Sequence, residues 1–97
     1  MTQTAIDQFM STIDFNEFQL IRNHKVGDQV AALKKNIEEA LRHAESETQR
    51  GRVVFEVEPH ALQYTIKVGD QSTTYPLGLF KIVGGKRAGK RYSIEVE

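Results

Sequence analysis

Glycines and basic residues alternate between Gly84 and Arg91 in a spacing that can bind phosphate. The run GGKRAGK matches GxxxxGK, in which backbone amides cradle phosphates and the lysine neutralises them. Arg91, however, occupies the position where such loops need a Ser or Thr for magnesium, and no helical pattern follows. The spacing therefore favours a glycine-rich turn over a nucleotide-binding loop.

The same segment gathers positive charge. Residues 50–97 contain eight basic and five acidic residues, and five of those bases fall in an acid-free window, residues 81–91. A two-stranded ribbon with a basic tip can follow a phosphate backbone or meet an acidic protein surface. A solvated tip without a role is the competing interpretation. The residues predicted to contact an anionic partner, protein or nucleic acid, are Lys81, Lys86, Arg87, Lys90, Arg91 and Tyr92.

Glu39, His43 and Glu47 are spaced four residues apart and could present two carboxylates and an imidazole to a metal. We expect this helix face to point to solvent and to carry stabilising charge pairs instead. The sequence therefore predicts neither a metal site nor a cofactor.

The remaining polar residues form no recognisable catalytic set. Residues 72–74, Ser-Thr-Thr, lack the GxSxG elbow of a nucleophilic serine, and Glu56 and Glu58 fall on the expected wet face of a strand. We expect a non-catalytic binding or regulatory protein. Small proteins of this composition are commonly adaptors, inhibitors, immunity proteins or regulators from bacteria and their phages, which is an association and not a derivation.

An apolar patch suggests self-association as an alternative to binding an anionic partner. Phe15, Phe18 and Ile21 could form an exposed surface for self-association, and a sheet edge could do the same. A homodimer or larger homo-oligomer is therefore the alternative to the basic ribbon, and core packing of these three side chains competes with it.

Length and composition exclude several classes of site and protein. The chain has 97 residues, zero formal net charge and no cysteine, so disulfides and thiolate metal sites are excluded. No segment approaches the ~20 apolar residues that a bilayer requires, so no membrane association is expected. We expect a cytoplasmic protein of one domain, residues 1–97.

Helical periodicity dominates the first half, residues 1–49. Ile6, Phe9 and Met10 share one face of a helix expected over residues 4–13 with Thr4 as N-cap, and Phe15 begins a second stripe over residues 15–23. Asp28 is the expected N-cap of a third helix. Its apolar stripe consists of Val30, Leu33, Ile37, Leu41 and Ala44.

After Gly51 the apolar period changes from about 3.6 to 2, which indicates strands. Alternation predicts five strands in residues 52–97, with turns at Pro59-His60, at Gly69-Asp70 and over residues 75–78. Because one sheet face is apolar, the helices must cover it. The predicted fold is α+β, with two or three N-terminal helices on one face of a four- to five-stranded antiparallel meander.

Overall fold

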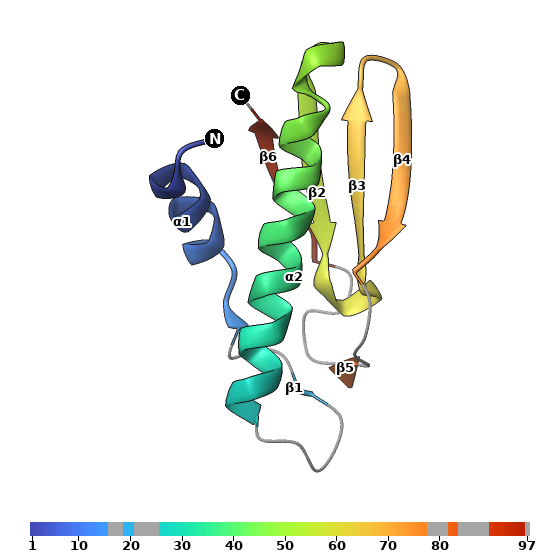
Figure 1. Ribbon diagram of the computed structural model, residues 1–97. Coiled ribbons are helices and arrows are strands. Elements are labelled where there is room, and N and C mark those ends of the chain that lie inside the picture. The colour runs from blue at the N-terminus through green and yellow to red at the C-terminus, as the bar shows by residue number, and fades with distance from the viewer. Residues whose placement is uncertain (16–18, 21–25, 78–81, 84–89, 97) are drawn as a thin grey trace.

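The computed structural model is an α+β fold in which helices cover one face of an antiparallel sheet (Figure 1). The structure describes residues 1–15, 19–20, 26–77, 82–83 and 90–96. Within these residues lie two α-helices, a four-stranded sheet and a separate two-stranded sheet. The α+β class and the antiparallel sheet are thus confirmed.

The first helix, α1, spans Gln3–Ser11, close to the predicted segment. Its N-cap is Thr2 and not Thr4, because the Thr2 hydroxyl accepts the Ala5 amide at 3.1 Å. Ile6 and Phe9 are buried on its inner face, as their spacing predicts.

The second helix, α2, spans Val26–Ser46 and runs along the sheet beside β2, between α1 and β3 (Figure 1). The N-cap predicted at Asp28 is wrong, since the helix already includes residues 26–28. A short 3-10 turn, Thr48–Arg50, follows it and ends at Gly51, whose φ of 135° turns the chain into the sheet. Four residues of the predicted apolar stripe are described and all are buried: Leu33, Ile37, Leu41 and Ala44. Ala40 of the same helix is buried with them.

The main sheet has the strand order β4-β3-β2-β6. A 3-10 turn, Pro59–Ala61, joins β2 to β3, and Gly69 with a φ of 58° opens the tight turn between β3 and β4. Pro76 is the last residue of β4, so the turn predicted over residues 75–78 does not begin where expected. The strands are β2 Val53–Glu58, β3 Gln63–Val68, β4 Gln71–Pro76 and β6 Tyr92–Val96.

The predicted meander is wrong in its last step. Three strands, β2, β3 and β4, follow one another as hairpins, but β6 returns across the sheet to pair with β2, which gives a Greek-key order. The expected fourth strand is reduced to β5, Ile82–Val83, among the described residues. It pairs with β1, Gln19–Leu20, outside the main sheet.

The helix predicted over residues 15–23 is also contradicted, because Gln19 and Leu20 form the strand β1. An apolar spacing that fits a short helix cannot reveal pairing with a strand far along the chain. The first half of the chain is therefore not purely helical, and the remainder of that predicted helix, apart from Phe15, lies outside the described residues.

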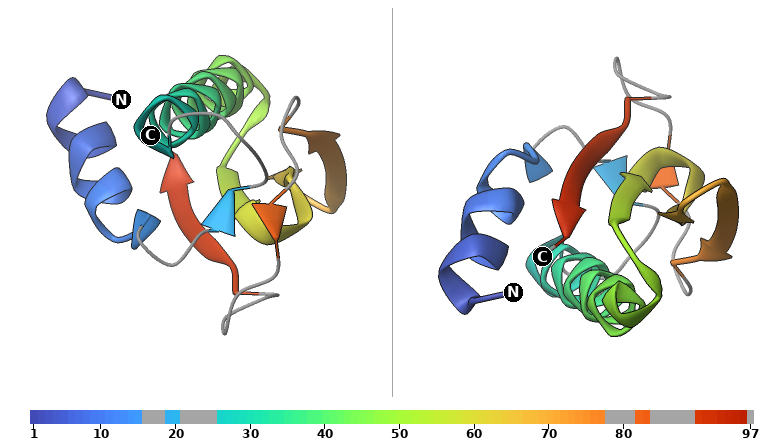
Figure 2. Two further views of the ribbon diagram at one scale, coloured as in Figure 1. Left: turned by 90° about the horizontal axis from the view of Figure 1, so that it is seen from below. Right: turned by 90° about the horizontal axis from the view of Figure 1, so that it is seen from above.

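The core lies between α2 and the inner face of the sheet. Val53, Phe55 and Val57 of β2 are fully buried under the helix. Phe9 of α1 meets Phe55 edge to face with ring centroids 5.8 Å apart, so α1 closes the β6 side of the core. Seen along the helix, β3 and β4 extend past α2 on the side away from α1 (Figure 2).

Candidate binding surface

The basic segment enters the described structure at Lys90 and Arg91, directly before β6. Lys81, Lys86 and Arg87 lie outside the described residues. Among the described residues, Ile82 and Val83 of β5 pair with β1, and β6 pairs with β2, so these two strands do not pair with each other. The rest of the predicted β-hairpin lies outside the part of the chain that the structure describes.

Arg91 is exposed but already bound to acidic residues on the outer face of the sheet. Its Nε donates to Glu58 Oε1 at 3.0 Å, and Nη1 lies 3.5 Å from Glu56 Oε1. These contacts raise the pKa of Arg91, first through the hydrogen bond with Glu58 and then through the charges of Glu58 and Glu56. Arg91 thus fastens the start of β6 to β2.

Lys90 has a different environment. Its side chain is exposed, and its amino group lies 5.0 Å from the centre of the Tyr92 ring. Tyr92 itself is only 8% exposed and belongs to the core. Tyr92 therefore lies beside Lys90 and exposes little surface of its own.

The outer face of the sheet around Arg91 holds a polar recess of about 290 Å³. Lys67 lies 3.3 Å from Glu56, so two bases and two acids balance there. The Thr65 and Thr74 hydroxyls, from β3 and β4, hydrogen-bond to each other at 3.0 Å. These ion pairs and the hydrogen bond between the two threonines stabilise the outer face of the sheet here.

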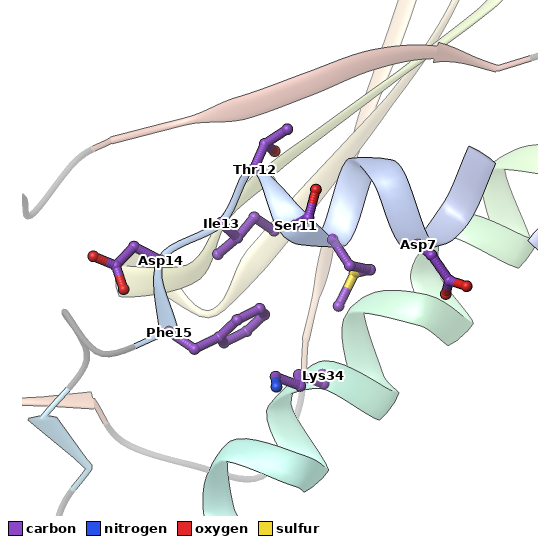
Figure 3. Close-up of a pocket in the computed structure, with 8 residues that line it drawn as sticks. Asp7, Ser11, Thr12, Ile13, Asp14, Phe15 and Lys34 are labelled. Atoms are coloured by element: carbon purple, nitrogen blue, oxygen red, sulfur yellow. The ribbon is translucent and has the colours of Figure 1, made fainter. Parts of the chain in front are cut away.

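The apolar patch is described only at Phe15. Its ring is half-buried against the core, and the Lys34 amino group lies 5.1 Å from the ring centre. Figure 3 shows the two side chains facing each other across a recess of about 580 Å³ between the end of α1 and α2. Phe18 and Ile21 lie outside the described residues. Of the three patch residues, only Phe15 is therefore described: its side chain packs against the core, and the Lys34 amino group lies over its ring.

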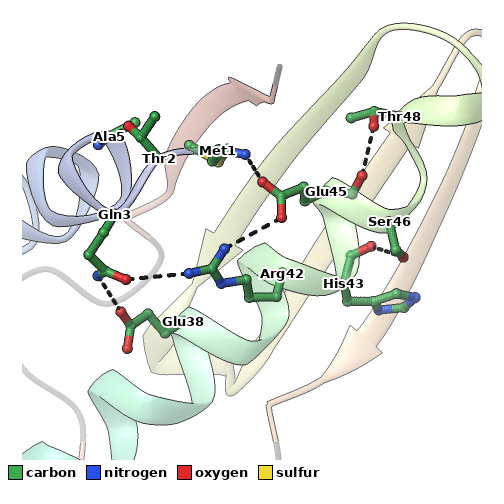
Figure 4. Close-up of polar contacts among 10 residues, drawn as sticks. All are labelled: Met1, Thr2, Gln3, Ala5, Glu38, Arg42, His43, Glu45, Ser46 and Thr48. Atoms are coloured by element: carbon green, nitrogen blue, oxygen red, sulfur yellow. Dashed lines mark hydrogen bonds and ion pairs between the residues drawn. The ribbon is translucent and has the colours of Figure 1, made fainter.

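A polar network fixes the N-terminal segment to α2 (Figure 4). The amide of Gln3 bonds Glu38 at 3.0 Å and accepts from Arg42 at 3.3 Å, and Arg42 in turn contacts Glu45 at 3.5 Å. The amino group of Met1 also pairs with Glu45. Glu38 and Arg42, four residues apart on α2, both bond Gln3 and so connect the two helices.

Sequence reasoning missed a cluster on the inner face of β3 and β4. His43 is half-buried and not solvated as expected: its Nδ1 lies 2.9 Å from the Tyr64 hydroxyl, and its ring meets Tyr75 edge to face at 4.8 Å. Tyr64 stacks on Tyr75 at 5.3 Å. Burial, and secondarily Tyr75, raises the pKa of Tyr64. The alternation of Tyr64 and Tyr75 toward the helix side was the signal that could have revealed the cluster.

The proposed metal triplet is not assembled. The nitrogens of His43 face Tyr64 and Glu47, the latter at 3.9 Å. Over the described ranges, no three histidine, aspartate or glutamate side chains are arranged to hold a metal ion. Neither described helix is long and apolar enough to cross a bilayer.

Comparisons with family models, with curated proteins and with solved structures give no match.

Proposed function

We propose that this chain is a non-catalytic binding protein that uses the basic segment before β6 to recognise an anionic partner, an acidic protein surface or a nucleic acid. The supporting observation is the charge distribution of residues 81–91, which hold five bases and no acid and include an exposed Lys90. Neutralising phosphates or carboxylates would supply the affinity.

The contacts of the two described bases, Lys90 and Arg91, support different roles for them. Arg91 is bound by Glu56 and Glu58, so its charge is balanced inside the molecule. Lys90 lies directly before β6, and its amino group faces the Tyr92 ring; among the described residues no carboxylate pairs with it. Arg91 therefore holds the segment in place, and the binding charge comes from Lys81, Lys86, Arg87 and Lys90.

The test is a variant in which those four bases become glutamine and Arg91 is kept. A matched control removes the same charge from exposed positions elsewhere: Lys34, Lys35, Arg42 and Arg52 to glutamine. Binding is measured by salt elution from heparin and by anisotropy titrations with a labelled DNA duplex, a single-stranded RNA and a polyglutamate peptide.

We expect the segment variant to elute at lower salt than the wild type and the control. The slope of log affinity against log salt should fall by about 0.9 for each duplex DNA phosphate that the variant no longer neutralises. The probe whose binding weakens most identifies the partner class. Equal elution of the segment variant and the control would refute the proposal.

A further inference from the structure

The two edges of the main sheet are β6 and β4, and they differ in charge. The β6 edge carries Arg91 and Glu95, and Glu95 pairs with Arg52 at 2.8 Å. Strand β4, Gln-Ser-Thr-Thr-Tyr-Pro, has no charged side chain. Among the described residues no strand pairs with its outer side. Charges, bulges or prolines normally protect an edge strand from pairing with another chain. In β4 only Pro76, its last residue, provides such protection.

The register shows which backbone groups of β4 are unpaired. The Leu77 amide donates to the Leu62 carbonyl at 2.7 Å, in line with the β3–β4 pairing. Hydrogen-bonded pairs alternate along an antiparallel ladder, so Thr73 and Tyr75 direct their amides toward β3. The residues that face the free edge are Ser72, Thr74 and the amide-less Pro76.

We propose that β4 pairs antiparallel with β4 of a second copy about a two-fold axis at Thr73. In this register Ser72 of one copy exchanges both backbone hydrogen bonds with Thr74 of the other, so every outward amide of β4 finds an acceptor. Thr73 of one copy then lies opposite Thr73 of the other in a non-hydrogen-bonded pair, and a Thr–Thr pair is a favourable cross-strand contact. Pro76 falls outside the paired core, where its missing amide is not needed.

Charge favours a second copy as the occupant. A self-paired neutral strand brings no like charges together. Arg50 is held beside β4, where its Nη2 donates to Gln71 at 2.9 Å. The same guanidinium pairs with Glu47 at 3.2 Å and remains exposed. The two-fold register sets Gln71 opposite Tyr75 of the second copy, which brings this guanidinium toward the partner's aromatic ring.

Assembly ends at the dimer. Once two β4 strands are joined, both remaining edges are β6, whose charged side chains oppose further pairing. The interface is a short strand, smaller than a standard protein interface, and we therefore expect a roughly micromolar dissociation constant. This surface lies at the opposite edge of the main sheet from Lys90 and Arg91, which precede β6, and the inference is independent of the proposed function.

Sedimentation velocity over a concentration series tests the pairing, with a charge swap at Thr73 as the decisive experiment. Thr73 is exposed, so T73K and T73E should fold normally. Each variant alone places like charges opposite each other and should dimerise at least about tenfold more weakly than the wild type. An equimolar mixture should recover the dimer, because Lys then faces Glu.

Proline substitutions supply the matched control. T74P removes an outward amide at the β4 edge, whereas S93P removes one at the β6 edge, where alternation also directs the amide away from β2. T74P should abolish the dimer and S93P should keep it, with circular dichroism confirming both folds. A wild type that stays monomeric to about 500 μM, or a mixture of charge variants that does not recover, would overturn the inference.

Discussion

Replacing Tyr64 by Phe removes one hydroxyl from the junction of α2 and β3 and leaves the ring in place. The hydroxyl bonds His43 Nδ1 at 2.9 Å, whereas the stacking on Tyr75 depends on the ring. A net hydrogen bond in a half-buried site contributes about 1 kcal/mol. For a domain of this length, removing it lowers Tm by roughly 4–8 °C.

The assay is urea unfolding followed by circular dichroism, with Tyr75→Phe as the matched control. Tyr75 contributes to the cluster through its ring contacts alone in the described structure, so removing its hydroxyl should change the free energy of unfolding by less than about 0.5 kcal/mol. In a His43→Ala background the cost of Tyr64→Phe should nearly vanish, because the partner is gone.

Two results would refute this reasoning. Equal destabilisation by Tyr64→Phe and Tyr75→Phe would show that the bond to His43 contributes nothing specific. A cost that persists in the His43→Ala background would assign the hydroxyl to another partner and remove the cluster as a link between α2 and the sheet.

Three further predictions concern pH, packing and the turn. The pKa of Tyr64 is raised in the fold, so its contribution to stability is present below pH 10.0 and is lost as pH rises through the raised value. The Tm of the wild type should therefore fall more than that of Tyr64→Phe as pH rises above 10.0. Ile37→Ala, at a fully buried position of α2, should lower the free energy of unfolding by about 2–5 kcal/mol in urea titrations, and a decrease below about 1 kcal/mol would contradict its place in the core. Gly69→Ala should cost about 1–2 kcal/mol in the same assay, because φ is 58° and nothing lies within 4 Å of the added methyl group; a neutral result would exclude this turn.

Local patterns were sufficient for the parts of the fold whose partners lie nearby. The change of period at Gly51 located the boundary between α2 and the main sheet, and alternation after it predicted one apolar sheet face, which carries Phe55, Tyr64 and Ile94. The turn at Gly69 followed from glycine's tolerance of positive φ. Each of these signals is carried by consecutive residues.

Long-range pairing was not accessible to the same reasoning. The alternation of β6 is equally compatible with β5 or β2 as its neighbour, and the glycine-rich run favoured the wrong choice. Gln19 and Leu20 lie in an apolar spacing that suits a helix, yet they pair with β5. His43 likewise depends on Tyr64 and Tyr75 from strands that no helix pattern reveals.

Amide hydrogen exchange along β4 tests most directly whether this strand is the free edge of the sheet. The strand order predicts slow exchange of Thr73 and Tyr75 at every protein concentration and fast exchange of Ser72 and Thr74 in dilute solution, with protection of these two amides appearing as the concentration rises. Protection of Ser72 and Thr74 in the dilute monomer would place another strand beside β4 and contradict the sheet order.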